Sequence, residues 1–240
     1  MTLSKTLSKK KFAIYGIGAT GLSVIRYFQS LGFKNFYAWD DIAKKRRQIK
    51  KKTSIKNFSK KLNTVDYIIL SPGINVNKSK LKKQLLKNKR KIITDLDLFY
   101  LHNPNVISIV VTGTNGKSTT VKLIESMLRC GGRRAQAAGN VGTPVLSLVG
   151  APLDFAVLEV SSFQLEATEC FQPNIAVILN LSPDHLDRHG NFERYAETKQ
   201  RLLAHQDPTN IALLSFDDEN VRAMADNTSA EVVAFSLRGE

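Results

Sequence analysis

Cysteine is scarce in this chain, because Cys130 and Cys170 are the only two among 240 residues. Two cysteines exclude a disulfide framework and a zinc site made of cysteines alone, and we expect both to be buried thiols. Long apolar runs are also missing: no apolar stretch has membrane-spanning length, and the polar start MTLSKTLSKKK contains no signal-peptide core. These absences favour a globular protein of the cytoplasm, without membrane insertion.

Acidic residues are scarce in the first part of the chain. Residues 1–105 contain 24 Lys and Arg against 5 Asp and Glu, whereas residues 106–240 contain 11 against 16. Such a basic half attracts nucleic acid, an acidic surface or an anionic substrate. Its lysines lie in runs, at 44–52 and 78–91, without the interleaved aromatic residues on which bases stack. This pattern favours a solvated face, and we expect no specific nucleic-acid partner.

The most informative stretch that is present is VISIVVTGTNGKSTT, residues 106–120. Its apolar, mostly β-branched start predicts a buried strand that runs into a glycine turn, with a helix after it. Backbone N–H groups of such a turn converge on phosphate, the lysine adds positive charge, and the hydroxyl can ligate Mg²⁺. The spacing is not G-x-x-x-x-G-K-[ST], because Val111 stands five positions before Gly116. We predict a phosphate-binding loop, and the alternative is a glycine turn that only caps a helix.

A second glycine turn lies near the start of the chain. An apolar strand at residues 11–15 enters GIGATG at 16–21, and apolar residues at helical spacing follow at 22–31. The next strand, 36–39, ends at Asp40, which stands where dinucleotide-binding folds place a ribose-binding acid. The motif alone does not identify the ligand. A nicotinamide-dependent dehydrogenase is therefore an alternative, although it leaves the loop after residue 112 without a role.

Further strand and helix patterns alternate along the rest of the chain. The first part continues with a strand at 65–70 that ends in SPGI, a lysine-rich helix at 78–89 and a strand at 91–94. The polar tetrapeptide HNPN then predicts a boundary between domains of residues 1–104 and 105–240. The second part contains a small-residue loop at 137–144, a helix at 193–204, and strands at 155–160, 175–181, 211–215 and 232–235. The fold class is therefore predicted to be α/β with parallel sheets.

Several motifs, taken in order, resemble the signatures of the Mur ligase family: TGTNGKS, GNVG, LEVSSFQLE, and DHLDRHG followed by a helix with YAETK. GATGLS, SPGI and the SSFQLE block resemble the family member that joins D-glutamate to UDP-N-acetylmuramoyl-L-alanine. The resemblance extends from about residue 11 to the end. It implies a Rossmann-like N-terminal domain that binds the UDP-sugar, followed by an incomplete P-loop central domain. The resemblance also implies that the third domain of the family, which binds the amino acid, lies outside this sequence.

The resemblance also implies a reaction and its residues. The reaction is ATP-dependent amide formation through an acyl phosphate, in peptidoglycan synthesis, by a monomer. ATP is implied to bind at Gly113, Thr114, Asn115, Gly116, Lys117, Ser118 and Thr119. Catalytic roles fall to Lys117, His185 and Lys199, and Mg²⁺ would be held by Ser118, Glu159, His185 and a carbamylated Lys199. The UDP-sugar is implied to bind at Ala19, Thr20, Asp40, Ser71 and Gly73, with Asn140, Ser161 and Gln164.

Plainer interpretations exist for these side chains. Glu159 at a strand end also fits a helix cap or a surface carboxylate, and His185 between acidic neighbours also fits an exposed histidine. Lys199 by itself fits a solvated helix lysine. Ile42 departs from the small polar or basic residues common in the family after the acidic pair, which leaves the uracil contacts open. Because the amino-acid domain is absent, the 240-residue chain by itself is expected to be a catalytically silent fragment that binds nucleotide and UDP-sugar.

Overall fold

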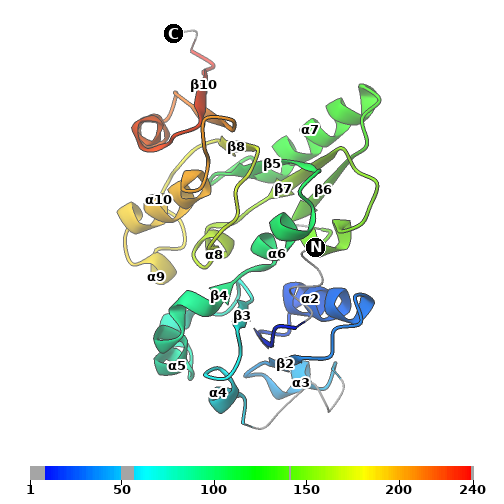
Figure 1. The fold of residues 1–240 in the computed structure, drawn as a ribbon. Coiled ribbons are helices and arrows are strands. Elements are labelled where there is room, and N and C mark those ends of the chain that lie inside the picture. The colour runs from blue at the N-terminus through cyan, green and yellow to red at the C-terminus, as the bar shows by residue number, and fades with distance from the viewer. Residues whose placement is uncertain (1–8, 50–56, 141, 239–240) are drawn as a thin grey trace. The chain divides into compact units, whose positions relative to one another are not determined.

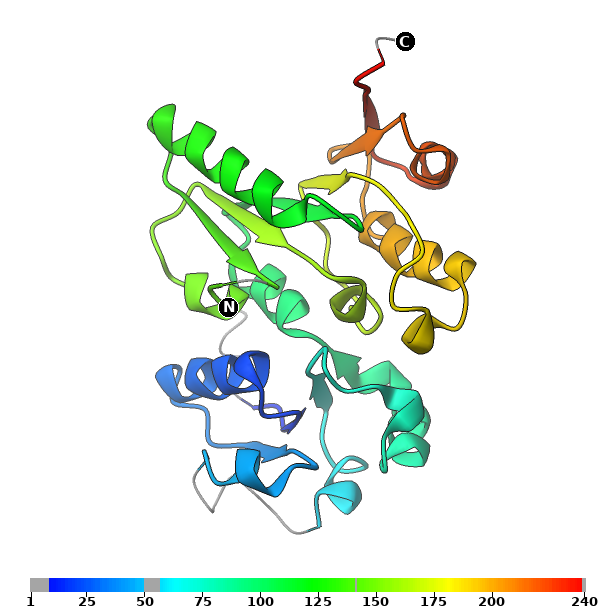
Figure 2. The same ribbon diagram turned by 180° about the vertical axis from the view of Figure 1, so that it is seen from behind.

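The computed structural model describes residues 9–49, 57–140 and 142–238, so Val141 of the GNVG motif and part of the 44–52 lysine run lie outside the described residues. The chain divides into two compact units, Met1–His102 with Ala167–Glu169, and Asn103–Glu166 with Cys170–Glu240. Each unit has its own parallel sheet (Figures 1 and 2). The predicted parallel α/β class is confirmed.

The first unit is built on a four-stranded sheet with the order β2-β1-β3-β4. The strands are β1 (Phe12–Tyr15), β2 (Phe36–Trp39), β3 (Tyr67–Leu70) and β4 (Ile92–Ile93), and every pairing is parallel. All of β1 is buried, as expected for a central strand covered on both faces. The carboxyl ends of these strands lie at one edge of the sheet. That edge carries the GIGATG turn, Asp40 and Ser71.

Helices cover both faces of this sheet. On one face α2 (Ala19–Ser30) brings Phe28 against Phe12, with ring centroids 4.7 Å apart. On the other face Tyr15 packs with Phe58 of α4 (Phe58–Lys61) and Leu85 of α5 (Lys82–Lys87). The unit also contains α3 (Ala43–Arg46) and α6 (Asp95–His102). The short segment 167–169 joins it through the Glu169 N–H, which donates to Asp97 Oδ1 at 3.1 Å.

The prediction of one continuous helix over residues 78–89 is wrong. The structure has a 3-10 turn η1 (Val76–Lys78), then α5, then a second 3-10 turn η2 (Lys89–Lys91). Ser79 interrupts the helix, because its backbone is extended at ψ 141° and its Oγ accepts the Leu81 N–H at 2.9 Å. Local hydrogen bonding by serine therefore outweighs the helical propensity of the lysines.

The second unit is built on a six-stranded parallel sheet with the order β10-β9-β8-β5-β7-β6. Its strands are β5 (Ile107–Thr112), β6 (Ala135–Gly139), β7 (Phe155–Glu159), β8 (Ile175–Ile178), β9 (Ile211–Ser215) and β10 (Glu231–Phe235). The central helix α7 (Lys117–Cys130) lies along one face of this sheet (Figure 1), where Val121 packs on Val111 and Val157. Because side chains alternate along a strand, Val110 and Leu158 point to the opposite face. The predicted phosphate-binding loop, residues 113–116, is called the P-loop below. It joins β5 to α7 at the carboxyl edge of the sheet.

The remaining helices of this unit are α8 (Ser162–Leu165), α9 (Leu186–His189), α10 (Phe192–Gln200), α11 (Glu219–Arg222), and the 3-10 turns η3 (Val145–Leu148), η4 (Arg201–Leu203) and η5 (Ala223–Asn227). Helix α10 contacts both α8 and α9. Among the described residues, no helix is both long and apolar enough to cross a membrane.

Four further expectations for the second unit need correction. Residues 137–139, the start of the small-residue loop expected at 137–144, belong to edge strand β6 (Ala135–Gly139), which pairs in parallel with β7. The expected strand 175–181 ends as a strand at Ile178, and the helix at 193–204 is α10 followed by the 3-10 turn η4. The expectation of two buried thiols is also wrong: Cys130 is exposed at the end of α7, and Cys170 is half-buried.

Candidate active site

The P-loop turns sharply between β5 and α7. Gly113 has φ 151° and Gly116 has φ 85°, and the left-handed conformation at Gly116 is one that residues with a Cβ rarely adopt. These turns bring the N-terminus of the 14-residue helix α7 to the carboxyl edge of the sheet, where its unpaired N–H groups favour an anion. Lys117 Nζ donates to the loop's own carbonyl oxygens, at 2.9 Å to Gly113 and 2.7 Å to Thr114. The loop therefore concentrates donors and one cation at a single place.

Ser118 of α7 and Glu159 at the end of β7 are in contact. Ser118 lies in the first turn of α7 and donates from Oγ to Glu159 Oε2 at 2.6 Å. Glu159 ends β7 and is only 3% exposed, and its Oε1 accepts from the exposed Asn140 side-chain amide at 3.2 Å. A hydroxyl and a carboxylate side by side are hard oxygen donors of the kind that Mg²⁺ binds.

Lys199 of α10 is buried beside the P-loop. Its side chain is 2% exposed, and its Nζ donates to Gly113 O at 2.9 Å and to Thr112 Oγ1 at 3.3 Å. Burial, followed by the nearby positive charge of Lys117, lowers the pKa of Lys199 to about 7. The interpretation of Lys199 as a solvated surface lysine is therefore wrong, and a large share of its amine is uncharged near neutral pH.

Two residues that hold the P-loop were missed in the sequence. The Asn180 side chain, just after β8, accepts the Asn115 N–H at 2.8 Å and donates to the Asn115 carbonyl at 3.1 Å. Tyr195 of α10 places its hydroxyl 3.0 Å from Thr114 Oγ1. Asn180 could have been found, because it follows a parallel strand at the same edge as the P-loop. Tyr195 belongs to the YAETK motif, but its place in an ordinary helical pattern did not indicate a contact with Thr114.

His185 lies in the loop that enters α9 and is half exposed. Its N–H donates to Asp184 Oδ1 at 2.8 Å, and its Nε2 lies 3.4 Å from Asp184 Oδ2. Asp184, one of its acidic neighbours in the sequence, is therefore in contact with it. The Phe163 ring lies against the imidazole with centroids 4.8 Å apart.

The SSFQLE block forms the start of α8. Ser161 is the N-cap, and its N–H and Oγ lie 3.0 and 3.1 Å from Gln164 Oε1 in a capping box. Both residues, expected to contact the UDP-sugar, therefore also fix the beginning of this helix. The next residue, Ser162, shares a 3.0 Å hydrogen bond with Nε2 of the buried His189.

The expected UDP-sugar residues of the first unit lie at the carboxyl edge of its sheet. Ala19 is exposed at the start of α2, and Gly73 is exposed after β3. Asp40 is 3% exposed, and its carboxylate accepts the N–H groups of Ile17 at 2.7 Å and Ile42 at 2.8 Å. It thus ties the glycine turn to the end of β2, and a ribose contact by Asp40 stays a prediction.

Two further residues complete this set in the first unit. Thr20 is half-buried in the first turn of α2. Ser71 is buried, and its Oγ donates to Gly16 O at 2.9 Å. This bond holds the glycine turn against the end of β3, in the same way that Asp40 holds it against β2.

A cavity of about 660 Å³ lies beside the P-loop within the second unit. Its lining includes Asn115, Gly116, Thr120, Asn180, Asp217 and Phe235. The space therefore adjoins both the phosphate loop and the ends of β8, β9 and β10. Within the described ranges no cluster of three or more His, Cys, Asp and Glu side chains is arranged to hold a metal ion.

Two family profiles match the chain. The Mur ligase middle domain matches residues 111–240, and the N-terminal domain described as Mur ligase MurD-like matches residues 10–93. The chain is 33% identical over 242 residues to the UDP-N-acetylmuramoylalanine--D-glutamate ligase of Caldanaerobacter subterraneus subsp. tengcongensis, covering 97% of this chain and 53% of that protein. It is 38% identical over 225 residues to the protein of the same name from Rickettsia bellii, covering 91% and 48%. The chain spans about half the length of these curated relatives.

A solved structure supports the fold. The crystal structure of the UDP-N-acetylmuramate:L-alanyl-gamma-D-glutamyl-meso-diaminopimelate ligase from Neisseria meningitides aligns with a TM-score of 0.59 at 16% identity, covering 94% of this chain and 78% of that one. At this identity the likeness concerns the fold alone. The middle-domain profile, however, matches more than half of the sequence. The matched segment includes the P-loop, Glu159, His185 and Lys199. The chain therefore belongs to the Mur ligase family.

Proposed function

We propose that this chain supplies the UDP-sugar-binding and ATP-binding parts of an ATP-dependent amide ligase that adds D-glutamate to UDP-N-acetylmuramoyl-L-alanine. The observation that carries the proposal is the Ser118–Glu159 contact of 2.6 Å beside a P-loop whose helix N-terminus, Lys117 and buried Lys199 converge at one sheet edge. The names of the relatives supply the substrates. The proposal includes peptidoglycan synthesis as its context, the cytoplasm as its location and a monomeric state.

The chain's own residues answer the main electrostatic problem of this reaction. A carboxylate that attacks the terminal phosphate of ATP brings two anions together, and like unit charges 4 Å apart repel by about 4 kcal/mol at an effective dielectric of 20. The α7 N-terminus and Lys117 present positive potential where those charges meet. Lys117 leaves its loop carbonyls to reach the phosphate, so bound phosphate replaces the two bonds it makes now.

The residues present fit Mg²⁺, because Ser118 Oγ and a Glu159 oxygen lie 2.6 Å apart at the loop and both are hard oxygen donors. These two would hold the first ion, and the remaining ligands would come from phosphate and water, which is the usual arrangement for Mg²⁺. His185 and Lys199 are the proposed ligands of a second ion. When bound, Mg²⁺ supplies Lewis-acid stabilisation of the phosphoryl oxygens.

The protonation state of Lys199 supports its proposed carbamylation. A carbamate forms when an uncharged amine attacks CO₂ and loses a proton, so an ordinary lysine with a pKa near 10.4 is mostly unreactive at pH 7. Burial lowers the pKa of Lys199 to about 7, which supplies the uncharged amine. The carbamate would carry the negative charge that a metal ligand beside Lys117 needs.

The nucleotide-sugar is proposed to bind at the strand ends of the first unit, near Ala19, Thr20 and Gly73. Contacts by Asn140, Ser161 and Gln164 stay predictions. The exposed backbone at Gly73 and the GIGATG turn support this assignment, because small residues let a ligand approach closely. The 660 Å³ cavity beside Asn115 and Gly116 is the proposed place for part of the ATP nucleoside.

The test is equilibrium titration of the 240-residue polypeptide with ATP and Mg²⁺. Lys117→Met is expected to weaken ATP binding at least about 10-fold without unfolding the chain, since it removes a charge-assisted phosphate contact. Lys122→Met is the matched control, because Lys122 lies on the same helix with a side chain 74% exposed. Equal ATP affinity in the two variants contradicts the P-loop assignment.

A second titration separates the proposal from the dehydrogenase alternative. UDP-N-acetylmuramoyl-L-alanine is expected to bind, and Gly73→Trp is expected to abolish that binding by filling the approach to the strand ends. NADH fluorescence is expected to stay unchanged on mixing. A fluorescence shift that persists in Gly73→Trp would instead favour a nicotinamide site at residues 16–21.

A further inference from the structure

Two motif blocks of the second unit pack on each other around the ring of Phe163. The Arg188 guanidinium carbon lies 4.1 Å from the centroid of this ring, and the His185 imidazole lies with its centroid 4.8 Å away. Phe163 is half-buried and belongs to α8, whereas His185 is the N-cap of α9 and Arg188 lies within α9. The ring therefore connects an arginine that the proposed mechanism does not use with a histidine that it does.

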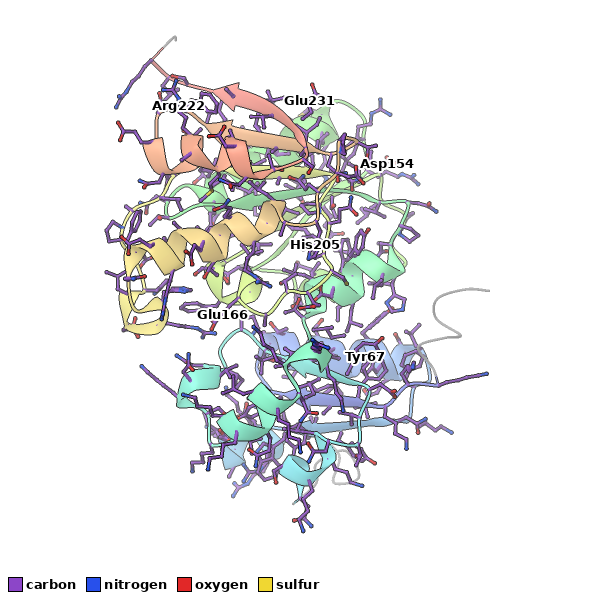
Figure 3. The ribbon with its side chains drawn as sticks, turned by 60° about the vertical axis from the view of Figure 1, so that its left-hand side comes forward. Tyr67, Asp154, Glu166, His205, Arg222 and Glu231 are labelled. Carbon is purple, nitrogen blue, oxygen red and sulfur yellow. The ribbon has the colours of Figure 1, made fainter. Side chains whose placement is uncertain are left out.

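Arg188 is held firmly in this position. Its Nε and Nη2 both lie 2.8 Å from Glu166 Oε2, and its side chain is only 9% exposed. Glu166 is the C-cap residue of α8 and is labelled in Figure 3. A planar guanidinium that is paired and largely desolvated keeps one orientation over an aromatic face better than a surface lysine does.

His185 needs such support because its backbone is strained. It has φ 51° and ψ 33°, and within residues 9–49, 57–140 and 142–238 it is the one residue other than glycine with positive φ. Its carbonyl accepts the N–H groups of Arg188 at 2.9 Å and His189 at 3.1 Å, which fixes the backbone. A backbone conformation of this kind costs about 1 to 3 kcal/mol of folding free energy. It persists only where surrounding contacts stabilise it, and it occurs often at functional sites. The half-exposed imidazole itself is held by Phe163 and Asp184.

We propose that Arg188 is a positioning residue for His185, acting through Phe163. Arg188, fixed by Glu166, keeps the Phe163 ring against the imidazole and so sets the orientation of the His185 side chain. The functional part of this inference rests on the proposed function, because it assumes that His185 is a metal ligand. The structural part, that Arg188 controls the imidazole orientation, does not depend on any metal.

The first experiment reads the imidazole directly, without metal or substrate. An aromatic ring 4.8 Å from an imidazole shifts its proton resonances by ring current, and His185→Gln identifies those signals by their loss. Phe163→Leu defines their position without the ring. In Arg188→Met the His185 signals are expected to move toward the Phe163→Leu position, and in Arg188→Lys they are expected to lie in between. Arg201→Met is the control. Arg201 is exposed and donates to the carbonyl of Leu165 at 2.9 Å, and Leu165 belongs to α8, as Phe163 does.

The outcome is decisive whether or not Arg188→Met folds, because Arg188→Lys keeps the charge and can be measured in its place. His185 signals that stay at their wild-type position in a folded Arg188→Met or Arg188→Lys protein overturn the proposal. The same conclusion follows if Arg201→Met moves them as much. In that case Arg188 serves only to fasten α9 to α8.

The second experiment measures the Mg²⁺ concentration for half-maximal rate in the full-length gene product. Residues that orient a metal ligand typically change metal affinity 10- to 100-fold, so we expect at least a 10-fold rise for Arg188→Met and none for Arg201→Met. In a His185→Gln background, Arg188→Met is expected to add nothing. Additive effects overturn the positioning role. If His185→Gln leaves the Mg²⁺ requirement unchanged while the imidazole signals still respond to Arg188, the metal assignment in the proposed function fails and the positioning stands.

Discussion

Lys199 shows how a residue's position changes its chemistry. It carries the same amine as the exposed lysines of the first unit, yet its side chain is 2% exposed and its neighbours are Thr112 Oγ1, the Gly113 carbonyl and the charge of Lys117. Removing water destabilises the ammonium form, and the second cation adds to this. The chain thus keeps one lysine uncharged in part at neutral pH, at the place where the proposed chemistry needs a nucleophilic amine.

This pKa makes stability depend on pH in a defined window. The folded pKa of about 7 lies below the usual value of 10.5, so between these values the unfolded chain binds more protons. The free energy of unfolding contributed by Lys199 therefore rises as the pH increases from about 7 to about 10.5, and the group is least favourable below pH 7. Urea unfolding of wild type and Lys199→Met at several pH values measures it. Parallel curves for the two proteins across this window would show that the amine titrates normally.

A second expectation concerns carbamate formation. In ¹³C-labelled bicarbonate the Lys199 carbamate signal is expected to be present near pH 7 to 8, since the amine is already half uncharged there. Lys117→Met is expected to raise the pKa of Lys199 and so to move the appearance of the signal to higher pH. A signal that appears only near pH 10 in the wild type would mean that burial does not lower the pKa as described.

Glu159 gives a third expectation at this scale. Glu159→Gln keeps the shape and can still accept from Ser118, but it removes the negative charge, so affinity for ATP with Mg²⁺ is expected to fall about 10-fold or more. Glu125→Gln is a matched control, because Glu125 accepts the Ala137 N–H at 2.9 Å from the body of α7. Titrations with and without Mg²⁺ distinguish a metal ligand from a structural carboxylate, for which both titrations would change equally.

At the scale of elements, the formation of strand β6 depends on its pairing with strand β7. Its residues AQAAG have little strand propensity, and they pair with β7 along Ala135–Gly139. At Gly139, which has φ 117°, an added Cβ would overlap the Glu159 carbonyl oxygen. Close packing of the β6 end against the Glu159 backbone thus fixes the carboxylate that is proposed to bind Mg²⁺.

Gly139→Ala is therefore expected to destabilise the second unit by about 3 kcal/mol or more, through overlap and backbone strain together. Gly132→Ala is the comparison, because Gly132 has φ 74° but open space around its Cβ position, and about 1 to 2 kcal/mol is expected there. Denaturant unfolding of both variants tests this. Equal losses would mean that backbone conformation alone, and not the contact with Glu159, sets the cost.

The elements also show what the sequence could and could not predict. Strands β2 and β9 have the predicted bounds, because apolar β-branched and aromatic runs identify buried strands without knowledge of their neighbours. Helix α6 was missed because DLDLFYLH has no polar face, and β6 because only pairing with β7 makes it a strand. In the same way, motif order located the P-loop, but the roles of Asn180 and Tyr195 depend on contacts between distant segments.

At the scale of the whole molecule, the relatives are about twice as long as this chain. In the family the D-glutamate site lies in the third domain, and holding both reactants in position can supply about 7 to 11 kcal/mol of a reaction barrier. We therefore expect the 240-residue polypeptide by itself to bind UDP-N-acetylmuramoyl-L-alanine weakly and to show no phosphate release that depends on D-glutamate. Phosphate release by the purified 240-residue polypeptide that increases on addition of D-glutamate would contradict this expectation.

The most direct test of the central claim is phosphate release by the full-length gene product with ATP, Mg²⁺, UDP-N-acetylmuramoyl-L-alanine and D-glutamate, each omitted in turn. The account predicts release on the order of 1 per second or more only when all four are present. It also predicts loss of that release in Lys117→Met and retention in Lys122→Met. Release that continues without the UDP-sugar or D-glutamate, or that survives Lys117→Met, would contradict the assignment of this chain as the nucleotide-binding part of a D-glutamate ligase.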